Sequence, residues 1–186
     1  MLQEKMDELL ELCYILDEQG KLATAHAEQL DREFQIHQPH LIQENGGLKA
    51  AEILAEATAN GLLYLAGERL SFTTAGRKRA EGLVRRHRLA EKLFTDVLEL
   101  SYDHSETTAC KIEHILSEEV TDSVCSFLGH PPMCPHGKSI PRGRCCQKFV
   151  REVAPIVTQL TELEIGAARE KSCVSDEASV RWASLE

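Results

Sequence analysis

A cysteine, a glutamate and a histidine stand close together in the sequence, at the spacing of one helix face. They are Cys110, Glu113 and His114. Positions i, i+3 and i+4 lie on the same side of an α-helix, so a thiol, a carboxylate and an imidazole converge. This mixed set suits a divalent transition metal better than calcium or magnesium, which prefer oxygen alone. The same spacing is also typical of an ordinary helix face with a buried thiol.

Two further pairs of potential ligands have helical spacing. His87 and Glu91 are four residues apart, and Glu8 and Glu11 are three residues apart. Such pairs are common on solvated helix faces. They contribute to a metal site only if the fold brings them to the first cluster.

A second group of potential ligands lies in a segment rich in proline and glycine. Its members are Cys125, Cys134, His136, Cys145 and Cys146. Four thiols and one imidazole can hold Zn²⁺ at a structural site or an iron–sulfur (Fe–S) cluster. The alternative is a linker with free thiols. The N-terminus lacks the layout of a secretory signal, so we expect a reducing, cytoplasmic location in which cysteines serve as ligands more often than as disulfides.

Composition and charge exclude several classes of protein. The 186 residues are 42% hydrophobic and 27% charged, which is typical of one ordinary globular domain or two small ones. No apolar run approaches the roughly 20 residues of a membrane span. The formal charge of −9 argues against a general nucleic-acid coat. No nucleophile–base arrangement or phosphate-binding glycine loop appears, so we expect neither an enzyme nor a small-molecule substrate.

Hydrophobic periodicity predicts the elements that must position these residues. Helices are expected over residues 4–18, about 22–33 and 48–60, followed by a β-hairpin over 62–73. Three helices and then a hairpin is the order of a winged helix-turn-helix. Beyond it we expect a long helix over 74–100, a helical region over about 106–128 that can restart at Ser117, a loop over 129–144 and a short helix over 146–153.

The strings AEKL, EH-x-LS-x-EV and CPHG-x-x-IP follow one another between residues 84 and 141. In this order and spacing the chain resembles the diphtheria-toxin-repressor and manganese-transport-regulator family of metal-dependent transcriptional repressors. The resemblance implies a mainly α fold. It places a winged helix-turn-helix in residues 1–75 and a helical metal-binding and dimerisation domain in 76–143. Residues 144–186 would be a cysteine-containing linker with a partial FeoA- or SH3-like segment.

The resemblance also implies a ligand set. Positions that match the main metal site are Glu8, Glu11, Cys110, Glu113 and His114, and positions that match an ancillary site are His87, Glu91 and Glu106. The cysteine resembles the iron-responsive branch of the family, whereas the first-helix glutamates resemble the manganese-responsive branch. Both Fe²⁺ and Mn²⁺ therefore stay open as the metal.

The function implied is that of a homodimer that binds a palindromic double-stranded DNA operator when metal is bound, and so regulates metal-homeostasis genes, as a repressor. The sequence departs from the family in the helix before the hairpin. That helix has Lys49 as its only base, the residue we expect to bind DNA phosphates, beside Glu52 and Glu56. It follows an insertion over about 31–47. A second hypothesis is therefore a metal or Fe–S redox sensor of the same fold that has lost or altered DNA binding and acts through protein partners.

Overall fold

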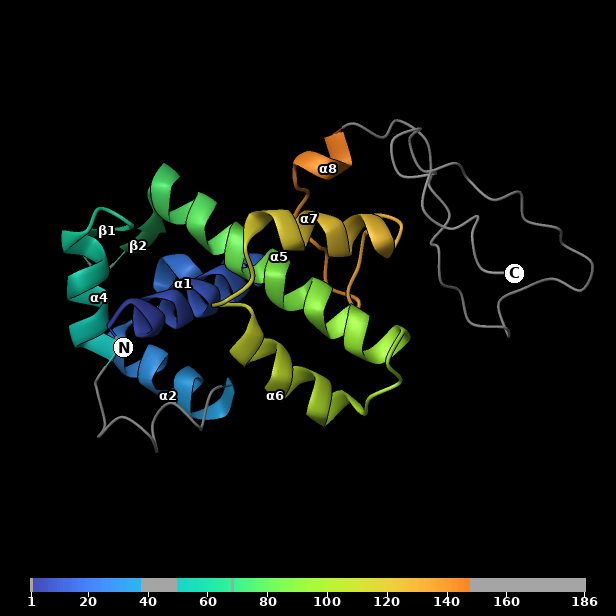
Figure 1. The fold of residues 1–186 in the computed structure, drawn as a ribbon. Coiled ribbons are helices and arrows are strands. Elements are labelled where there is room, and N and C mark those ends of the chain that lie inside the picture. The colour runs from blue at the N-terminus through green and yellow to red at the C-terminus, as the bar shows by residue number, and fades with distance from the viewer. Residues whose placement is uncertain (1, 38–49, 68, 148–186) are drawn as a thin grey trace, which may run out of the picture.

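The structure, a computed structural model, describes residues 2–37, 50–67 and 69–147. These residues are mainly helical, with a small antiparallel hairpin (Figure 1), which confirms the expected fold class. The elements are α1 (Leu2–Glu18), a 3₁₀ turn η1 (Leu22–Thr24), α2 (Ala27–His37), α4 (Ala50–Ala59), β1 (Leu63–Ala66), β2 (Arg69–Phe72), α5 (Thr74–Asp96), α6 (Tyr102–Ile112), α7 (Glu118–Phe127) and α8 (Arg144–Gln147). No described helix is long and apolar enough to cross a membrane.

The N-terminal half is built around the apolar face of α1. Leu9, Leu10 and Leu16 recur at helical spacing and are almost completely buried against α2, α4 and the hairpin. The helix ends at Glu18, and Gly20 just beyond it adopts a φ of 69°, so the Lys21 N–H can donate to the Leu16 carbonyl at 2.8 Å. This apolar packing orients the opposite face of α1 toward α5.

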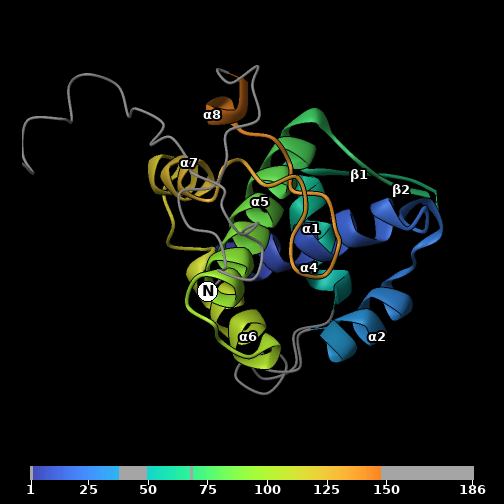
Figure 2. The same cartoon turned by 90° about the vertical axis from the view of Figure 1, so that its right-hand side faces the viewer.

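Helix α5 is the central element that joins the two halves. It packs against α1, α6 and α7, and the two views in Figures 1 and 2 show it running between them. Thr73 caps its start by accepting a hydrogen bond from the Gly76 N–H at 3.0 Å. A Cβ at Gly76 would lie 1.8 Å from the Leu62 carbonyl oxygen, so only glycine lets the hairpin approach this closely.

Basic side chains of α5 bind acidic side chains of α1. Arg88 is 5% exposed and donates through both terminal nitrogens to the Glu18 carboxylate, at 2.8 and 2.6 Å. Arg79 donates to Asp7 at 2.6 Å. Two-pronged arginine–carboxylate pairs are stronger and more directional than single contacts. These ion pairs hold α1 against α5.

Several predicted boundaries differ from the structure. The helix expected over 74–100 ends at Asp96, because Glu99 adopts a left-handed φ of 54° and turns the chain toward α6. The helix expected over 22–33 begins as the η1 turn. The restart at Ser117 is confirmed, since its hydroxyl accepts from the Val120 N–H at 3.2 Å.

Two predictions fall on residues outside the described ranges. Lys49 is one of them, and the other is nearly all of the segment 144–186, of which the structure describes α8 alone. The domain boundaries proposed from the sequence therefore stay predictions.

Candidate metal centre

Side chains from α1, α5 and the end of α6 meet in the interior between the two halves. Helix α1 supplies Glu8 and Glu11, α5 supplies His87, and the C-terminal cap of α6 supplies Glu113, followed by His114. The three glutamates are 2%, 5% and 0% exposed, respectively. Buried carboxylates in an apolar interior are costly unless a cation or proton balances them.

Glu8, Glu113 and His114 form the first ligand group. One ligand atom from each lies within 4.8 Å of the others. The His114 Nε2 lies 2.8 Å from Glu8 Oε1 and 3.6 Å from Glu113 Oε1. Three buried atoms of this group, Glu8 Oε2, Glu113 Oε1 and His114 Nδ1, have no hydrogen-bond partner among the described residues. Buried polar atoms are normally paired, and a metal ion bound at this group would satisfy these three atoms.

Glu11, His87 and Glu113 form the second group, which also lies within 4.8 Å. The His87 Nδ1 is 2.7 Å from Glu113 Oε2 and 3.6 Å from Glu11 Oε1. Glu113 therefore presents one oxygen to each group. A carboxylate placed in this way can bridge two adjacent metal positions.

Protons balance this centre when no metal is bound. Burial, reinforced by the nearby Glu113 charge, raises the pKa of Glu11 to about 8. Burial also raises the pKa of Glu113. Burial alone would lower the pKa of His87, but the carboxylate of Glu11 and hydrogen bonds to its ring raise it well above the usual value. A divalent cation can take the place of these protons, so the residues fit a metal.

Two positions from the predicted ligand set belong to none of the ligand groups found among the described residues. Cys110 is half-buried on α6 and hydrogen bonds with His87, and burial raises the pKa of its thiol. Glu106 is exposed on the same helix.

Glu91, Cys134 and His136 form a third group. The Glu91 Oε1 lies 3.3 Å from His87 Nε2 and 3.3 Å from His136 Nδ1. The loop turns back at Gly137, whose N–H donates to the Cys134 carbonyl at 2.9 Å. Cys134 and His136 were expected with the other C-terminal cysteines, whereas the structure brings them to Glu91 of α5, beside the second group.

Cys125, Cys145 and Cys146 come together in a fourth group, and His130 is the fourth member. The sequence analysis did not identify His130. The available signal was a histidine directly after Gly129, at the end of the helix that carries Cys125, because a glycine cap folds the chain back over the last helical turn.

The ligands of the first two groups come from both sides of the junction between α1 and the α5–α6 pair, so a metal bound there would couple its binding to the position of α1. Helix α1 supplies them on one side, and α5 and the end of α6 supply them on the other. A cation that binds all of these ligands can do so only when α1 is docked against α5 and α6. A ligand shifts an equilibrium toward the state that it binds more tightly, so such a cation would favour the docked over the undocked state.

Known proteins with similar sequences are iron-dependent and related repressors. Residues 73–142 match the family model described as "Iron dependent repressor, metal binding and dimerisation domain". The iron-dependent repressor IdeR of Mycobacterium tuberculosis is 33% identical over 135 residues, which are 71% of this chain and 53% of the relative. The diphtheria toxin repressor of Corynebacterium diphtheriae is 34% identical over 99 residues, 53% of this chain and 44% of the relative. The chain spans about half the length of the curated relatives it matches.

Solved structures share the fold. The manganese regulator SloR superposes with a TM-score of 0.61 at 23% identity, covering 74% of this chain and 59% of that one. ScaR with bound Zn²⁺ superposes with a TM-score of 0.58 at 22% identity, with the same coverage. By its sequence motifs and by the domain matched over residues 73–142, the chain is similar to the diphtheria-toxin-repressor and manganese-transport-regulator family of metal-dependent repressors, and it shares their fold.

Proposed function

We propose that the protein is a cytoplasmic, metal-dependent transcriptional regulator, not an enzyme, that represses metal-homeostasis genes when Mn²⁺ or Fe²⁺ binds between α1 and the α5–α6 pair. The observation that carries this proposal is the position of Glu113. It is fully buried and belongs to both ligand groups, each of which includes a glutamate of α1. Metal binding and the docking of α1 are therefore one event.

The donor set supports Mn²⁺ or Fe²⁺ as the metal. Carboxylate oxygens and imidazole nitrogens converge in the first two groups, and such ligands suit these ions. The thiol of Cys110 beside His87 is a softer donor that favours Fe²⁺ when it joins the set. The bound metal supplies charge neutralisation, while the protein residues supply the orientation.

The position of α1 is transmitted to the expected DNA-binding elements, α4 and the hairpin, through side-chain packing. Helix α1 packs against α4, and α4 packs against β1 of the wing-like hairpin. We propose that the metal thereby fixes the hairpin and α4 relative to the dimerisation half. In a homodimer this sets the distance between the two DNA-binding helices, one for each half-site of a palindromic operator.

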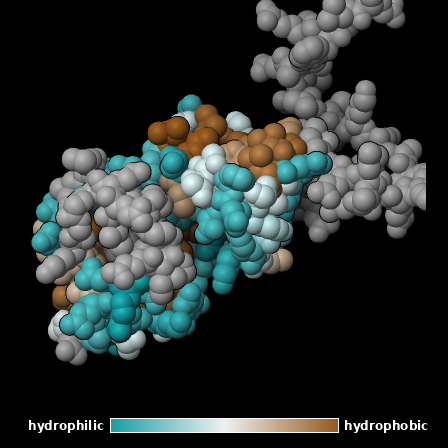
Figure 3. Space-filling model, turned by 90° about the horizontal axis from the view of Figure 1, so that it is seen from below, coloured by the Kyte–Doolittle hydropathy of each residue, from teal (hydrophilic) through white to brown (hydrophobic). Residues whose placement is uncertain are grey.

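Exposed apolar side chains support a homodimer. Figure 3 shows brown, apolar atoms gathered along one edge of the face seen from below. Near the start of α7, Ile115 is 79% exposed and Val120 48% exposed, and Leu98 is 55% exposed after α5. Large exposed apolar side chains of this kind are typical of protein–protein contacts. We place the dimer contact on this half of the chain.

Charge supports the second candidate, a sensor that acts through protein partners. Glu52 is exposed on α4, the helix expected to read DNA. Arg79 and Arg88 of α5 are paired with α1. Glutamate can accept a hydrogen bond from cytosine, but acidic residues weaken phosphate binding.

Selection of DNA from a random pool tests the function. We expect the anaerobically purified protein to enrich a two-fold-symmetric site with Mn²⁺ or Fe²⁺ and to enrich nothing in the presence of chelator. The more effective metal identifies the physiological one. Metal binding without enrichment of any sequence would contradict the repressor and favour the sensor.

A further inference from the structure

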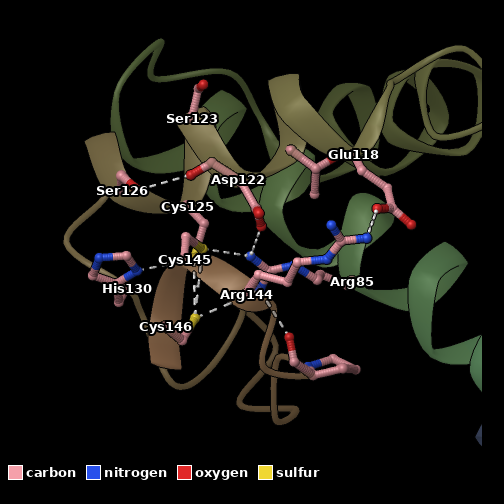
Figure 4. Close-up of polar contacts among 12 residues, drawn as sticks. Arg85, Glu118, Asp122, Ser123, Cys125, Ser126, His130, Arg144, Cys145 and Cys146 are labelled. Atoms are coloured by element: carbon pink, nitrogen blue, oxygen red, sulfur yellow. Dashed lines mark hydrogen bonds and ion pairs between the residues drawn. The ribbon is translucent and has the colours of Figure 1, made fainter. Parts of the chain in front are cut away.

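Three cysteines and a histidine converge on the opposite side of α5 from the first two ligand groups, which we call the regulatory metal centre. Cys125 lies near the end of α7, Cys145 and Cys146 lie on α8, and His130 lies in the turn between them. In Figure 4 the three sulfur atoms face one another, with the His130 ring on one side and Arg85 on the other. All three cysteines are free, so no disulfide accounts for the cluster.

The local fold explains why His130 reaches the cysteines. Helix α7 ends at Phe127, Gly129 beyond it adopts a φ of 75°, and the His130 N–H donates to the Cys125 carbonyl at 2.8 Å. This cap folds the chain back over the last turn of the helix. His130 itself has a left-handed φ of 56°, a conformation that is uncommon for residues other than glycine. The backbone is thereby held so that the ring faces the Cys125 sulfur.

The distances match the edges of a tetrahedron around one metal ion. With Zn–S bonds of about 2.3 Å and Zn–N bonds of about 2.1 Å, tetrahedral geometry gives S···S edges of about 3.8 Å and S···N edges of about 3.6 Å. The Cys125 Sγ lies 3.6 Å from Cys146 Sγ and 3.5 Å from His130 Nδ1. The Cys145 and Cys146 sulfurs are 3.8 Å apart.

The same distances argue against an iron–sulfur cluster. One ligand atom from each of the four residues lies within 4.8 Å of all the others. In a four-iron cluster each thiolate binds a different iron, so the sulfurs surround the cluster and lie well apart. Ligands this close to one another converge on a single ion.

The charge around the cluster fits three thiolates with a divalent ion. Arg85 is 6% exposed, and its Nη2 lies 3.1 Å from Cys145 Sγ and 3.0 Å from the Asp122 carboxylate. Three thiolates and Zn²⁺ carry a net charge of −1, and the Arg85 guanidinium, which also contacts Asp122, lies beside this negative charge. Neutral thiols in an apolar core would give a buried guanidinium no negative charge to pair with.

Gly143 makes room for this arginine. A Cβ at that position would lie 2.6 Å from the guanidinium carbon of Arg85. The arginine also donates to the Pro141 carbonyl at 2.8 Å, so the chain that leads into α8 wraps around it. The loop therefore leaves room for the positively charged guanidinium of Arg85 close to the cysteines.

We propose that Cys125, His130, Cys145 and Cys146 bind one Zn²⁺ at a closed structural site, separate from the regulatory metal centre. All four coordination positions are filled by the protein, as is typical of structural zinc. The ion fastens α8 to α7 and to the turn that follows α7. Because the loop between this turn and α8 carries Cys134 and His136, the zinc also holds these two residues beside Glu91.

The test uses the full chain, purified anaerobically and then reconstituted with Co²⁺ or Zn²⁺. We expect one equivalent of zinc per chain that survives dialysis against a chelator strong enough to remove Mn²⁺. Co²⁺ should give the d–d spectrum of a tetrahedral site and a near-ultraviolet charge-transfer absorption of the intensity of three thiolates. This spectrum is read on the unaltered protein, so it does not depend on the folding of any variant.

Matched variants locate the site. Cys145→Ser should lose the retained zinc and about one third of the thiolate absorption, whereas Cys134→Ser, which alters the same segment, should retain both. Glu113→Gln should also retain both, which separates this proposal from the regulatory site. The proposal is overturned if the unaltered protein retains no zinc, if Co²⁺ shows at most one thiolate ligand, if acid-labile sulfide is found, or if Cys134→Ser releases the zinc.

Discussion

Replacing Glu113 by glutamine is expected to lower the affinity for Mn²⁺ and Fe²⁺ by more than about 100-fold and to abolish metal-dependent DNA binding. Removing a mere supporting residue of a metal site costs about 10- to 100-fold in affinity. Glu113 belongs to both ligand groups, so its loss disrupts both. The metal-free variant should still fold, because glutamine has the same shape and removes one of the buried acids beside Glu8 and Glu11.

Calorimetric titration under anaerobic conditions measures this effect. Glu106→Gln is the matched control, since it makes the same substitution at an exposed position near the start of α6. We expect the control to bind metal as the unaltered protein does. If Glu113→Gln retained full affinity, or if the two variants lost affinity equally, the assignment of the centre would be wrong.

The metal-free protein is expected to lose stability as the pH rises from about 5 to 8. The pKa of Glu11 is raised to about 8, so the folded state keeps a proton that the unfolded state releases at lower pH. The hydrogen bond to Glu8 raises the pKa of His114, which acts in the same direction. Each such group lowers the free energy of unfolding by up to about 1.4 kcal/mol per pH unit within its window.

Thermal unfolding in chelator at several pH values tests the sign and the source of this effect. Glu11→Gln should flatten the dependence, because it removes the group with the raised pKa. Saturating Mn²⁺ should restore stability most strongly near the upper end of the window, since at about 100 times Kd a ligand contributes about 2.7 kcal/mol. Stability of the metal-free protein that rises with pH would contradict the proton balance at this centre.

Residues on helices could be predicted from the sequence because their positions follow from periodicity. Spacings of three and four residues placed Glu8 with Glu11 and Cys110 with Glu113 and His114 on common faces, and the hydrophobic pattern indicated which helices face the core. The order of the elements then implied the winged helix before a helical half.

Residues in loops could not be placed in the same way. Cys134 and His136 lie close in sequence to the other cysteines, but a turn at Gly137 sends them to α5 instead. His130 reaches Cys125 only because α7 ends in a glycine cap with two successive left-handed residues. Such turns depend on single φ values, which hydrophobic periodicity does not report.

The ion-pair partners of the basic residues of α5 could not be predicted from the sequence either. Seven lysines and arginines between Arg77 and Lys92 are typical of a phosphate-binding surface. In the structure Arg88 binds Glu18, and Arg85 lies against the thiols and Asp122. Their partners are distant in sequence, so charge counting alone does not show which of these side chains are paired in the interior.

The most direct test of the central claim measures the coupling between metal and DNA on the unaltered protein. The affinity for a selected DNA site is measured with and without Mn²⁺, and the affinity for Mn²⁺ is measured with and without that DNA. If the metal docks α1 and thereby orders the DNA-binding half, both affinities must rise by the same factor, as thermodynamic linkage requires. DNA binding that is equally tight in chelator and in Mn²⁺ would contradict the account.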